Sequence, residues 1–360
     1  MKSATKPLLA AAAAALGVAG AIVLGSRWLR HFDAALWSYA VGSILAAAAV
    51  AYRFTVWAQR PPSRMYFKRG LELLLRRGVG ALSSSSRTTR HAPRTVPGPT
   101  VTLAHAAAAN FAAQNFIRRR SLYRWVMHLC LSGGCTLAFA ITFPLVFGWI
   151  HFASLANDAE TYRVMVFGFG VDTFSVHSAK AFVMFNLLNF SAVIVLVGLV
   201  MAAIRRLTDA GERATQKFSE DILPLLLIAA VAVTGLGLTV SYKFLAGRGH
   251  SLMAVVHMVS VIALLFYIPF GKLFHMFQRT CSLCVSLYKK AGESGPHAHC
   301  VRCGEDFASQ MHVDDLKTVL DELSFNYRFA TTKGEVHYQD ICPACRRRLL
   351  ALNQGRSVGR

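Results

Sequence analysis

Six runs of apolar residues alternate with basic and polar segments along this chain. Each run is close to the roughly 20 residues that a helix needs to cross a bilayer. The first run lacks a small-x-small cleavage site and another apolar run follows at once, so we interpret it as a membrane helix rather than a signal peptide. The pattern predicts an all-α membrane protein with six transmembrane helices, at residues 7–25, 34–52, 123–150, 180–204, 221–240 and 249–277.

The polar segments have characters of their own. The motif RMYFKRGLELLLRRG, after the second run, mixes basic and apolar residues, which is typical of a helix lying along a membrane surface or of a docking helix for a partner. Residues 81–100 are rich in Ser, Pro and Arg and predict a flexible linker. We therefore expect four parts: an N-terminal transmembrane hairpin at 1–60, an amphipathic helix and linker at 61–122, a four-helix transmembrane domain at 123–280 and a polar domain at 281–360.

Composition agrees with the membrane class. Of 360 residues, 54% are hydrophobic and the mean hydropathy is +0.41, which is too apolar for a soluble protein of this size. The formal net charge is +21, but the basic residues gather at the ends of the apolar runs, as in cytoplasmic membrane loops, and this argues against nucleic-acid binding. The charge pattern predicts a bacterial-type inner (plasma) membrane protein with both termini in the cytoplasm.

Two histidines lie inside the last apolar run. His257 and His275 are 18 residues apart, which is five turns of an unbroken helix, so both rings would project from one face about 27 Å apart. An ionisable side chain inside a membrane helix marks a functional site. The spacing suits a helix that ligates two stacked hemes through neutral imidazole nitrogens. The alternative is one buried, hydrogen-bonded histidine and one that reaches the inner interface.

The third apolar run supplies a partner for His275. His128 lies one turn inside its basic end and is followed by small residues, Ser132-Gly133-Gly134, that let a flat group approach the helix backbone. Because His128 and His275 both lie at cytoplasmic helix ends, we expect them to clamp one heme. His257 lies nearer the outer leaflet, where His151 or His177 is available. We choose His151 because we expect it to share a helix with His128.

Residues from about 123 to 277 resemble the heme b-binding gamma subunit of respiratory nitrate reductase and its relatives, the membrane cytochromes of heterodisulfide and dissimilatory sulfite reductase complexes. Three segments carry the resemblance: RWVMHLCLSGG, DILPLLLIAAVAVTGLGL and HMVSVIALLFYIPFGKLFH. It implies that the terminal helix gives one ligand to each of two hemes b and that His128 completes the inner one. At the position that would complete the outer heme, this chain has Ala138.

The resemblance also implies a function. Members of this family anchor a redox complex in the membrane and exchange electrons between quinone or quinol and an iron–sulfur subunit on one face. We therefore expect a quinol-oxidising electron-transfer subunit of an oxidoreductase, in a hetero-oligomeric complex with cytoplasmic iron–sulfur and molybdoenzyme-type partners. No catalytic residue is assigned, although His151, His177 and Lys180 are candidates for the acid–base group at a quinol. No CxxCH motif is present, so the heme is expected to be non-covalent.

The polar tail contains two CxxC pairs, whose members are Cys300, Cys303, Cys342 and Cys345. Four thiolates in two knuckles make a closed tetrahedral site, which is typical of structural zinc. The pattern predicts a cytoplasmic zinc-ribbon or rubredoxin-like α+β domain. A single iron is the alternative, because CVRCG and CPAC resemble rubredoxin knuckles, although Arg346 stands where the second glycine is usual. A nearby histidine in place of one cysteine is a further alternative, and the candidates are His297, His299 and His312.

A rival class is a membrane transporter or sensor, whose histidines bind protons or metal and whose zinc domain reports to partners. Transporters are commonly built from internal repeats with a pair of broken helices at a midplane site. This sequence has no recognisable internal repeat of that kind. The pattern favours the membrane cytochrome over the transporter.

Overall fold

The computed structural model describes residues 2–83, 108–155, 158–279, 281–331 and 334–359. The chain forms two compact units. The first contains residues 1–55 and 107–276, and the second contains residues 56–106 and 277–360. Most of the predicted linker 81–100 lies outside the described residues.

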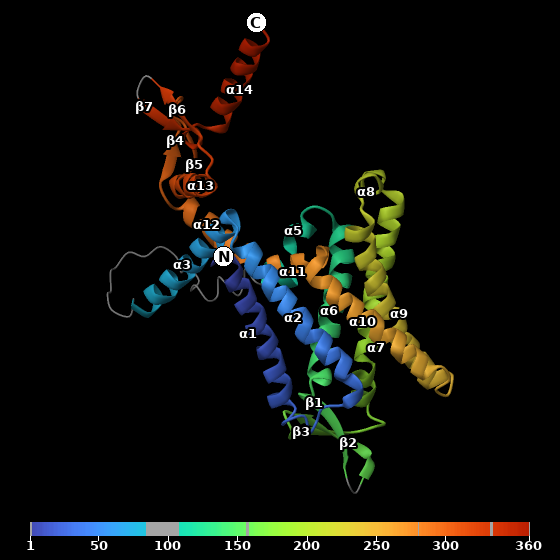
Figure 1. The fold of residues 1–360 in the computed structure, drawn as a ribbon. Coiled ribbons are helices and arrows are strands. Elements are labelled where there is room, and N and C mark those ends of the chain that lie inside the picture. The colour runs from blue at the N-terminus through green and yellow to red at the C-terminus, as the bar shows by residue number, and fades with distance from the viewer. Residues whose placement is uncertain (1, 84–107, 156–157, 280, 332–333, 360) are drawn as a thin grey trace, which may run out of the picture. The chain divides into compact units, whose positions relative to one another are not determined.

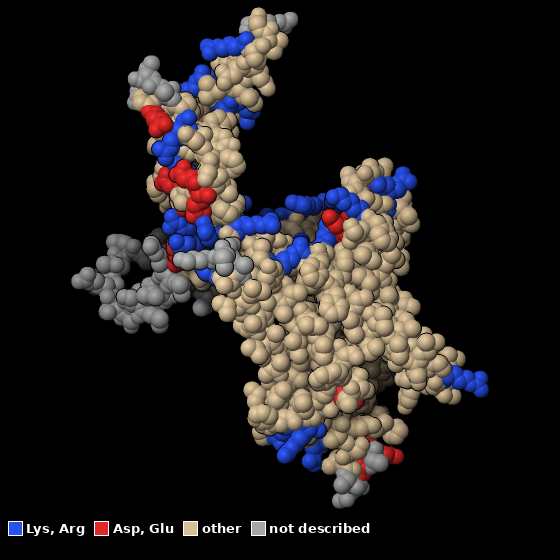
Figure 2. Space-filling model, viewed as in Figure 1, with Lys and Arg blue, Asp and Glu red and all other residues tan. Residues whose placement is uncertain are grey.

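The first unit is built from long helices that run in alternate directions (Figure 1). Six described helical segments are long and apolar enough to cross a membrane, which makes this a multi-pass membrane protein; they are Thr5–Gly25, Ala34–Ala58, Leu122–Val146, Ala179–Thr208, Phe218–Phe244 and His250–Phe270. Figure 2 shows few charged side chains along the middle of these helices and basic side chains gathered at their ends. The six predicted spans are confirmed.

Most of these spans are single helices. The corresponding elements are α1 (Lys2–Gly25), α2 (Trp37–Ala58), α6 (Leu122–Val146), α7 (Ala179–Thr208), α9 (Leu223–Phe244) and α10 (His250–Phe270). Shorter helical pieces join them: η1 (Ala34–Leu36), η2 (Ala108–Ala112), α5 (Asn115–Arg118), α8 (Ala210–Thr215) and η3 (Phe218–Ile222). Ser121 and Ser178 cap the N-termini of α6 and α7 with their hydroxyl oxygens, which accept hydrogen bonds from backbone N–H groups.

Four of the helices pack in a row. α6 packs along α7, α7 along α9, and α9 along α10, and no comparably extensive packing joins α6 to α10 among the described residues. Small residues bring α6 and α7 together: a Cβ added at Gly134 would lie 2.5 Å from a methyl of Val195. Ser191 also donates a hydrogen bond to the carbonyl of Gly134 at 2.9 Å. Gly134 is thus used for helix packing, whereas a Cβ at Gly133 would meet no atom within 4 Å.

The segment between the spans predicted at 123–150 and 180–204 is a folded sheet, so the unit is not all-α as expected. Three antiparallel strands lie in the order β1 (Ile150–Leu155), β2 (Asp158–Val166) and β3 (Phe169–Ser175). Val164 and Phe174 are buried against Ala181 of α7. Period-2 alternation explains the strand: Val164 points to the core and its neighbour Arg163 is exposed. The sheet covers one end of the helices (Figure 1).

A strained turn joins α1 to α2 at the same end of the unit. Arg27, Trp28 and Leu29 all have positive φ, between 51° and 66°, in a region that costs roughly 1–2 kcal/mol for each non-glycine residue. Hydrogen bonds hold the turn: the amide of Trp28 donates to Val23, and the amide of Leu29 donates to the hydroxyl of Ser26, which is fully buried.

The predicted helix 249–277 is wrong in one respect, because it is broken before His275. α10 ends at Phe270, and Gly271 has extended backbone (φ −92°, ψ −169°). The chain continues as a 3-10 turn, η4 (Lys272–Phe274), and one turn of α11 (His275–Gln278). Arg53 of α2 stabilises the break: its guanidinium donates to the carbonyls of Pro269 and Gly271 and lies 4.4 Å from the ring centroid of Phe274. His257 and His275 therefore do not share one helical face.

The second unit joins α3 (Pro61–Ser83) to the C-terminal part of the chain. α3 packs on α12 (Cys281–Glu293) and on α13 (Gln310–Glu322). A Cβ at Gly70 would lie 2.3 Å from the Cβ of Cys284, so the helices α3 and α12 touch backbone to backbone. The helix predicted in this segment is α3, and part of its described surface packs against α12 and α13 of the same chain.

An ion pair with a buried carboxylate stabilises this packing. Two guanidinium nitrogens of Arg69 on α3 donate hydrogen bonds to the Asp315 carboxylate, at 2.9–3.3 Å, and Asp315 also accepts a hydrogen bond of 2.9 Å from the Tyr288 hydroxyl. Burial, followed by the hydrogen bond to Asp315, raises the pKa of Tyr288 well above its usual range. Asp315 is 7% exposed, so the pair ties three helices together around one desolvated carboxylate.

Two hairpins and a final helix complete the second unit. The strands pair as β4 (His297–His299) with β5 (Asp306–Ser309) and as β6 (Arg328–Thr331) with β7 (Gly334–His337). The short turn η5 (Tyr338–Asp340) leads to α14 (Pro343–Ser357). The polar domain is α+β, as predicted, and it includes α3 as well.

Candidate metal centre and histidine sites

The four predicted cysteines meet in one place. The Sγ atoms of Cys300, Cys303, Cys342 and Cys345 all lie within 4.8 Å of one another, and that of Cys303 is 3.7 Å from that of Cys342. With metal–sulfur bonds of about 2.3 Å, a tetrahedral site separates its sulfur atoms by about 3.8 Å. The cluster can therefore hold one metal ion such as zinc or iron.

Two different structures carry the two cysteine pairs. Cys300 and Cys303 lie on the turn between β4 and β5, which Gly304 closes with a φ of +78°. Cys342 is the N-cap of α14, and its sulfur accepts a hydrogen bond from the Cys345 amide at 3.4 Å. The second pair thus belongs to a helix N-terminus, where the helix dipole favours thiolates, rather than to a second β-hairpin of the kind a zinc ribbon would use.

Backbone groups support ionised sulfur. Burial raises the pKa of Cys300, but N–H groups of Cys342, Cys303 and Arg302 donate to its sulfur and lower that pKa to about 6. Burial, and hydrogen bonds that its thiol donates to the neighbouring sulfurs, raise the pKa of Cys345 to about 12. The four groups therefore cannot all ionise beside one another without a cation among them. A bound metal ion supplies that charge, which is what a ligand set of four thiolates requires.

The surroundings of the cluster are closed on most sides. Cys300, Cys342 and Cys345 are buried with Ile341, and Phe307, Phe329 and Leu349 pack against them. Arg346 follows the last cysteine, where a rubredoxin-like knuckle would have glycine. Its side chain donates to the carbonyl of Ile341 at 2.7 Å and lies over the ring of Tyr338 at 4.8 Å. The arginine is thus part of the helical turn that carries the second pair.

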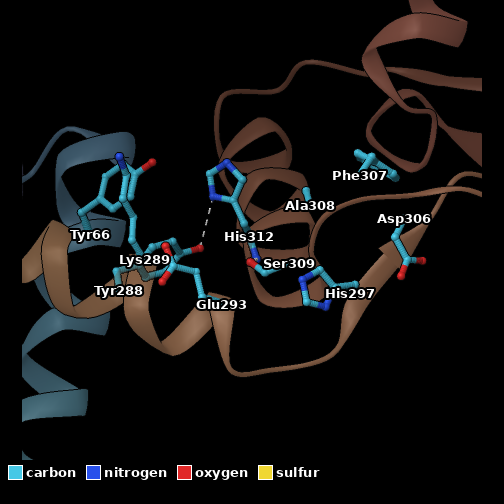
Figure 3. A pocket seen from close by; sticks show the side chains of 11 residues that line it. Tyr66, Tyr288, Lys289, Glu293, His297, Asp306, Phe307, Ala308, Ser309 and His312 are labelled. Carbon is cyan, nitrogen blue, oxygen red and sulfur yellow. Dashed lines mark hydrogen bonds between the residues drawn. The ribbon is translucent and has the colours of Figure 1, made fainter.

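The histidines proposed as substitutes for cysteine have other contacts. None of the three belongs to the cluster of metal-ligating groups found among the described residues. His299 pairs with Asp306, and the ring of His312 lies 5.9 Å from that of Tyr288. His297 and His312 instead line a cavity of about 500 Å³ between α12, α13 and the β4–β5 hairpin. Figure 3 shows His312 turned toward Tyr288, with Lys289 and Glu293 nearby, so the lining mixes both signs of charge.

His257 packs closely on α9. Its Nδ1 lies 2.9 Å from the hydroxyl of Thr234, and that hydroxyl donates its own proton to the carbonyl of Ala230 at 2.6 Å. With its own proton used in this way, the threonine oxygen can accept a proton from Nδ1, and in that neutral tautomer Nε2 carries the lone pair. Gly235 makes room for the ring, because a Cβ there would lie 3.3 Å from its Cε1 atom.

His275 has the same tautomer by a different contact. Its Nδ1 lies 2.7 Å from the carbonyl oxygen of Lys272. A carbonyl only accepts, so Nδ1 carries the proton and Nε2 carries the lone pair in the neutral ring. The short turn of η4 and α11 thus orients His275 independently of the axis of α10.

His128 is half-buried on α6 within a braced turn. Its carbonyl accepts a hydrogen bond from the Ser132 hydroxyl at 2.7 Å, and that hydroxyl accepts another from the amide of Gln114, also at 2.7 Å. The helix α6 packs along α7, and no comparably extensive packing joins it to α10 among the described residues. The expected pairing of His128 with His275 on one heme therefore stays a prediction.

His151 differs from its predicted setting. It lies on β1 and not on the helix that carries His128, because α6 ends at Val146. Its ring stacks on that of His31 from the α1–α2 turn, with centroids 4.4 Å apart and planes inclined by 18°. Burial, then the charges of His31 and Arg27, lower the pKa of His151. The sequence patterns do not predict the contacts made by three further residues: His31, Thr234 and Arg53. Only Thr234 could have been noticed, because it places a hydroxyl group within an apolar helix.

The other acid–base candidates are ordinary surface groups. His177 is exposed and lies 4.0 Å from Glu160, and Lys180 pairs with Asp172. Comparison with protein-family models, with curated proteins and with solved structures gives no match to this chain. The site therefore has to be interpreted from its own chemistry.

Proposed function

We propose that the chain is a membrane cytochrome b subunit that exchanges electrons between the quinone pool and a cytoplasmic iron–sulfur partner. The observation that carries the proposal is a contact common to His257 and His275: the Nδ1 atom of each lies 2.9 Å and 2.7 Å, respectively, from an oxygen, which favours the neutral tautomer with its lone pair on Nε2. A heme-ligating histidine needs this arrangement, with the far nitrogen held by a hydrogen bond. The nitrate reductase-like segments around the same histidines point the same way.

In this proposal the residues act as holders and the heme iron supplies one-electron chemistry when it is bound. His275 and His128 would hold an inner heme b and His257 an outer one. Thr234 fixes the ring of His257, and Gly235 allows that ring to lie against α9. Because His151 is stacked on His31 and lies on a strand, it would complete the outer site only after that stack opens.

Orientation follows from charge. Arg118, Arg119, Arg120 and Arg124 precede or open α6, and Arg205 and Arg206 close α7, all at the same end of the alternating helices. The α1–α2 turn and the sheet lie at the other end and carry fewer basic residues. We infer that the arginine-rich end faces the cytoplasm, together with both termini.

We further propose that the cysteine cluster holds structural zinc, with iron as the alternative. Three of the four cysteines are buried and no described ligand position is left open for a substrate, which suits a closed site. The metal would stabilise a unit whose core around the cluster is small. Elemental analysis of the full chain should give about one zinc per chain, and a red, redox-active protein without heme would favour iron.

Absorption spectra test the main proposal. Purified full-length protein, reduced with dithionite, should give the sharp alpha bands of low-spin heme b, and pyridine hemochrome analysis should give one or two hemes per chain. His275→Ala and His128→Ala should each remove the inner heme. Well-folded protein without heme would contradict the proposal and would favour a transporter or sensor.

A further inference from the structure

Exposed apolar side chains gather where two tight turns meet, at the sheet-covered end of the membrane unit. The α1–α2 turn presents Trp28 (75% exposed) and Leu29, and the β2–β3 turn presents Phe167 and Phe169 (68% exposed). Single exposed hydrophobic residues are common on protein surfaces. Four large apolar side chains from two adjoining turns form a patch, and such a patch marks a surface that contacts lipid or another protein.

Both turns are held in shape by specific contacts rather than left as loose loops. Val166 pairs with Phe169 across the two-residue turn Phe167-Gly168, in which both residues have positive φ, as in a type I′ hairpin. The side chain of Arg27 joins the two turns: its Nε donates to the carbonyl of Phe167 at 3.1 Å, and its guanidinium lies 4.7 Å from the ring centroid of Phe169.

The α6 end fixes the base of the patch. The indole of Trp149 donates a hydrogen bond of 2.8 Å to the carbonyl of Ala21 on α1, and its ring lies 5.9 Å from that of Phe167. Gly148 has a φ of +69°, and a Cβ there would lie 2.7 Å from the carbonyl oxygen of His31. The turns thus present preformed apolar tips on a rigid base.

The patch continues the lipid-facing surface of α1. Leu16 and Leu24 on this membrane-spanning helix are 73% and 66% exposed, and Trp28 follows four residues after Leu24 in the α1–α2 turn. The span ends at Gly25, so Trp28 and Leu29 lie within a few residues of the hydrocarbon boundary. Arg30, exposed beside them, supplies a cation at the level where lipid phosphates lie.

We propose that Trp28, Leu29, Phe167 and Phe169 form an apolar wedge that inserts into the headgroup region of the bilayer. Aromatic side chains favour this boundary because their rings are apolar and their polar edges remain hydrated. The wedge would set the depth and tilt of the sheet against the membrane through the α1–α2 turn. This inference depends only on the membrane-spanning helices and not on heme binding.

The experiment measures how strongly a lipid-bound quencher and an aqueous quencher reduce tryptophan fluorescence. Full-length protein is reconstituted in nanodiscs made with ordinary phospholipid or with phospholipid brominated on the acyl chain near the headgroup. The emission of Trp28 is obtained as the difference between the native protein and Trp28→Phe. Phe169→Trp reports the hairpin tip while keeping an aromatic ring beside Arg27. Glu160→Trp is the control, because Glu160 is an exposed residue near the other end of β2.

Brominated lipid should reduce the emission of Trp28 and of Trp at position 169 about twofold, with little quenching by aqueous iodide. The Glu160→Trp emission should respond in the opposite way. Emission from both wedge positions that iodide quenches as strongly as at position 160 would overturn the proposal and would indicate a protein partner for the patch. Because Trp28→Phe and Phe169→Trp give separate readouts, a folding defect in one leaves the other decisive.

Discussion

Thr234 holds the ring of His257 by Nδ1, across 2.9 Å between the side chains of two neighbouring helices. The threonine hydroxyl is itself fixed by the carbonyl of Ala230 one turn earlier on α9. The histidine is therefore oriented from outside its own helix. If its Nε2 ligates heme iron, the electronic character of that ligand is set by a residue of α9.

Removal of this hydrogen bond tests the role of His257. Thr234→Val keeps the shape of the side chain but leaves Nδ1–H without its acceptor, so the ligand becomes a weaker donor. We expect outer-heme retention to fall about tenfold and the midpoint potential to rise, as for the loss of other outer-shell hydrogen bonds to ligating histidines. Redox titration of the alpha band measures both. Thr234→Ser should behave as the native protein, and an unchanged titration in Thr234→Val would remove His257 from the ligand set.

Substitution of cysteines inside and outside the metal centre should change the metal content of the protein differently. Cys300→Ser or Cys342→Ser should lower bound metal from about one ion per chain to nearly none, because both sulfurs are buried members of a four-thiolate site. Cys281→Ser should leave the metal in place, since Cys281 lies on α12 outside the cluster. Elemental analysis of the full-length variants is the measurement. Retention of metal in both buried-cysteine variants would show that other groups bind it.

The ion pair between Arg69 and Asp315 should dominate the stability of the second unit. Arg69→Met leaves a carboxylate that is 7% exposed with Tyr288 as its remaining strong donor, and we expect a loss of about 2–3 kcal/mol in the free energy of unfolding. Arg64→Met is the matched control, because its pair with Glu322 is exposed and should contribute less than about 1 kcal/mol. The free energies of unfolding of the two variants are compared by denaturant titration, with proteolytic cleavage of the second unit as the readout of unfolding.

The stacked pair of His31 and His151 predicts a pH dependence. Burial and neighbouring positive charge hold the pKa of folded His151 below its ordinary value of 6.5. The unfolded state therefore binds the proton first, so this contact contributes fully above pH 6.5 and weakens as the pH falls from that value toward the folded pKa. Hydrogen exchange of the β1 amides should accelerate over that range. His151→Phe keeps the stack without titrating, and equal acceleration in that variant would contradict the assignment.

Some of the molecule could be predicted from local sequence and some could not. Hydropathy is a local quantity, so the six spans were found, and C-x-x-C spacing alone was enough for the metal cluster. The alternation of Tyr162, Val164 and Val166 was a strand signal that the membrane pattern around it obscured. Pro269 and Gly271 likewise indicate a break in the last span, but the regular spacing of the histidines suggested an unbroken helix.

Long-range partners were beyond the reach of sequence patterns. Arg69 and Asp315 are 246 residues apart, and nothing in either local segment specifies the other. The stack of His31 on His151 also depends on a left-handed turn of three non-glycine residues, which local propensity disfavours. These contacts exist because the surrounding packing holds them in place.

The break at Gly271 connects the N-terminal hairpin to the turn that carries His275. Arg53 belongs to α2, yet it anchors this turn through the carbonyl of Pro269 and the ring of Phe274. A ligand mounted on such a turn can be displaced slightly without shifting the axis of any membrane span. In the proposed cytochrome, a small movement of α2 would therefore change the position of His275 relative to the inner heme.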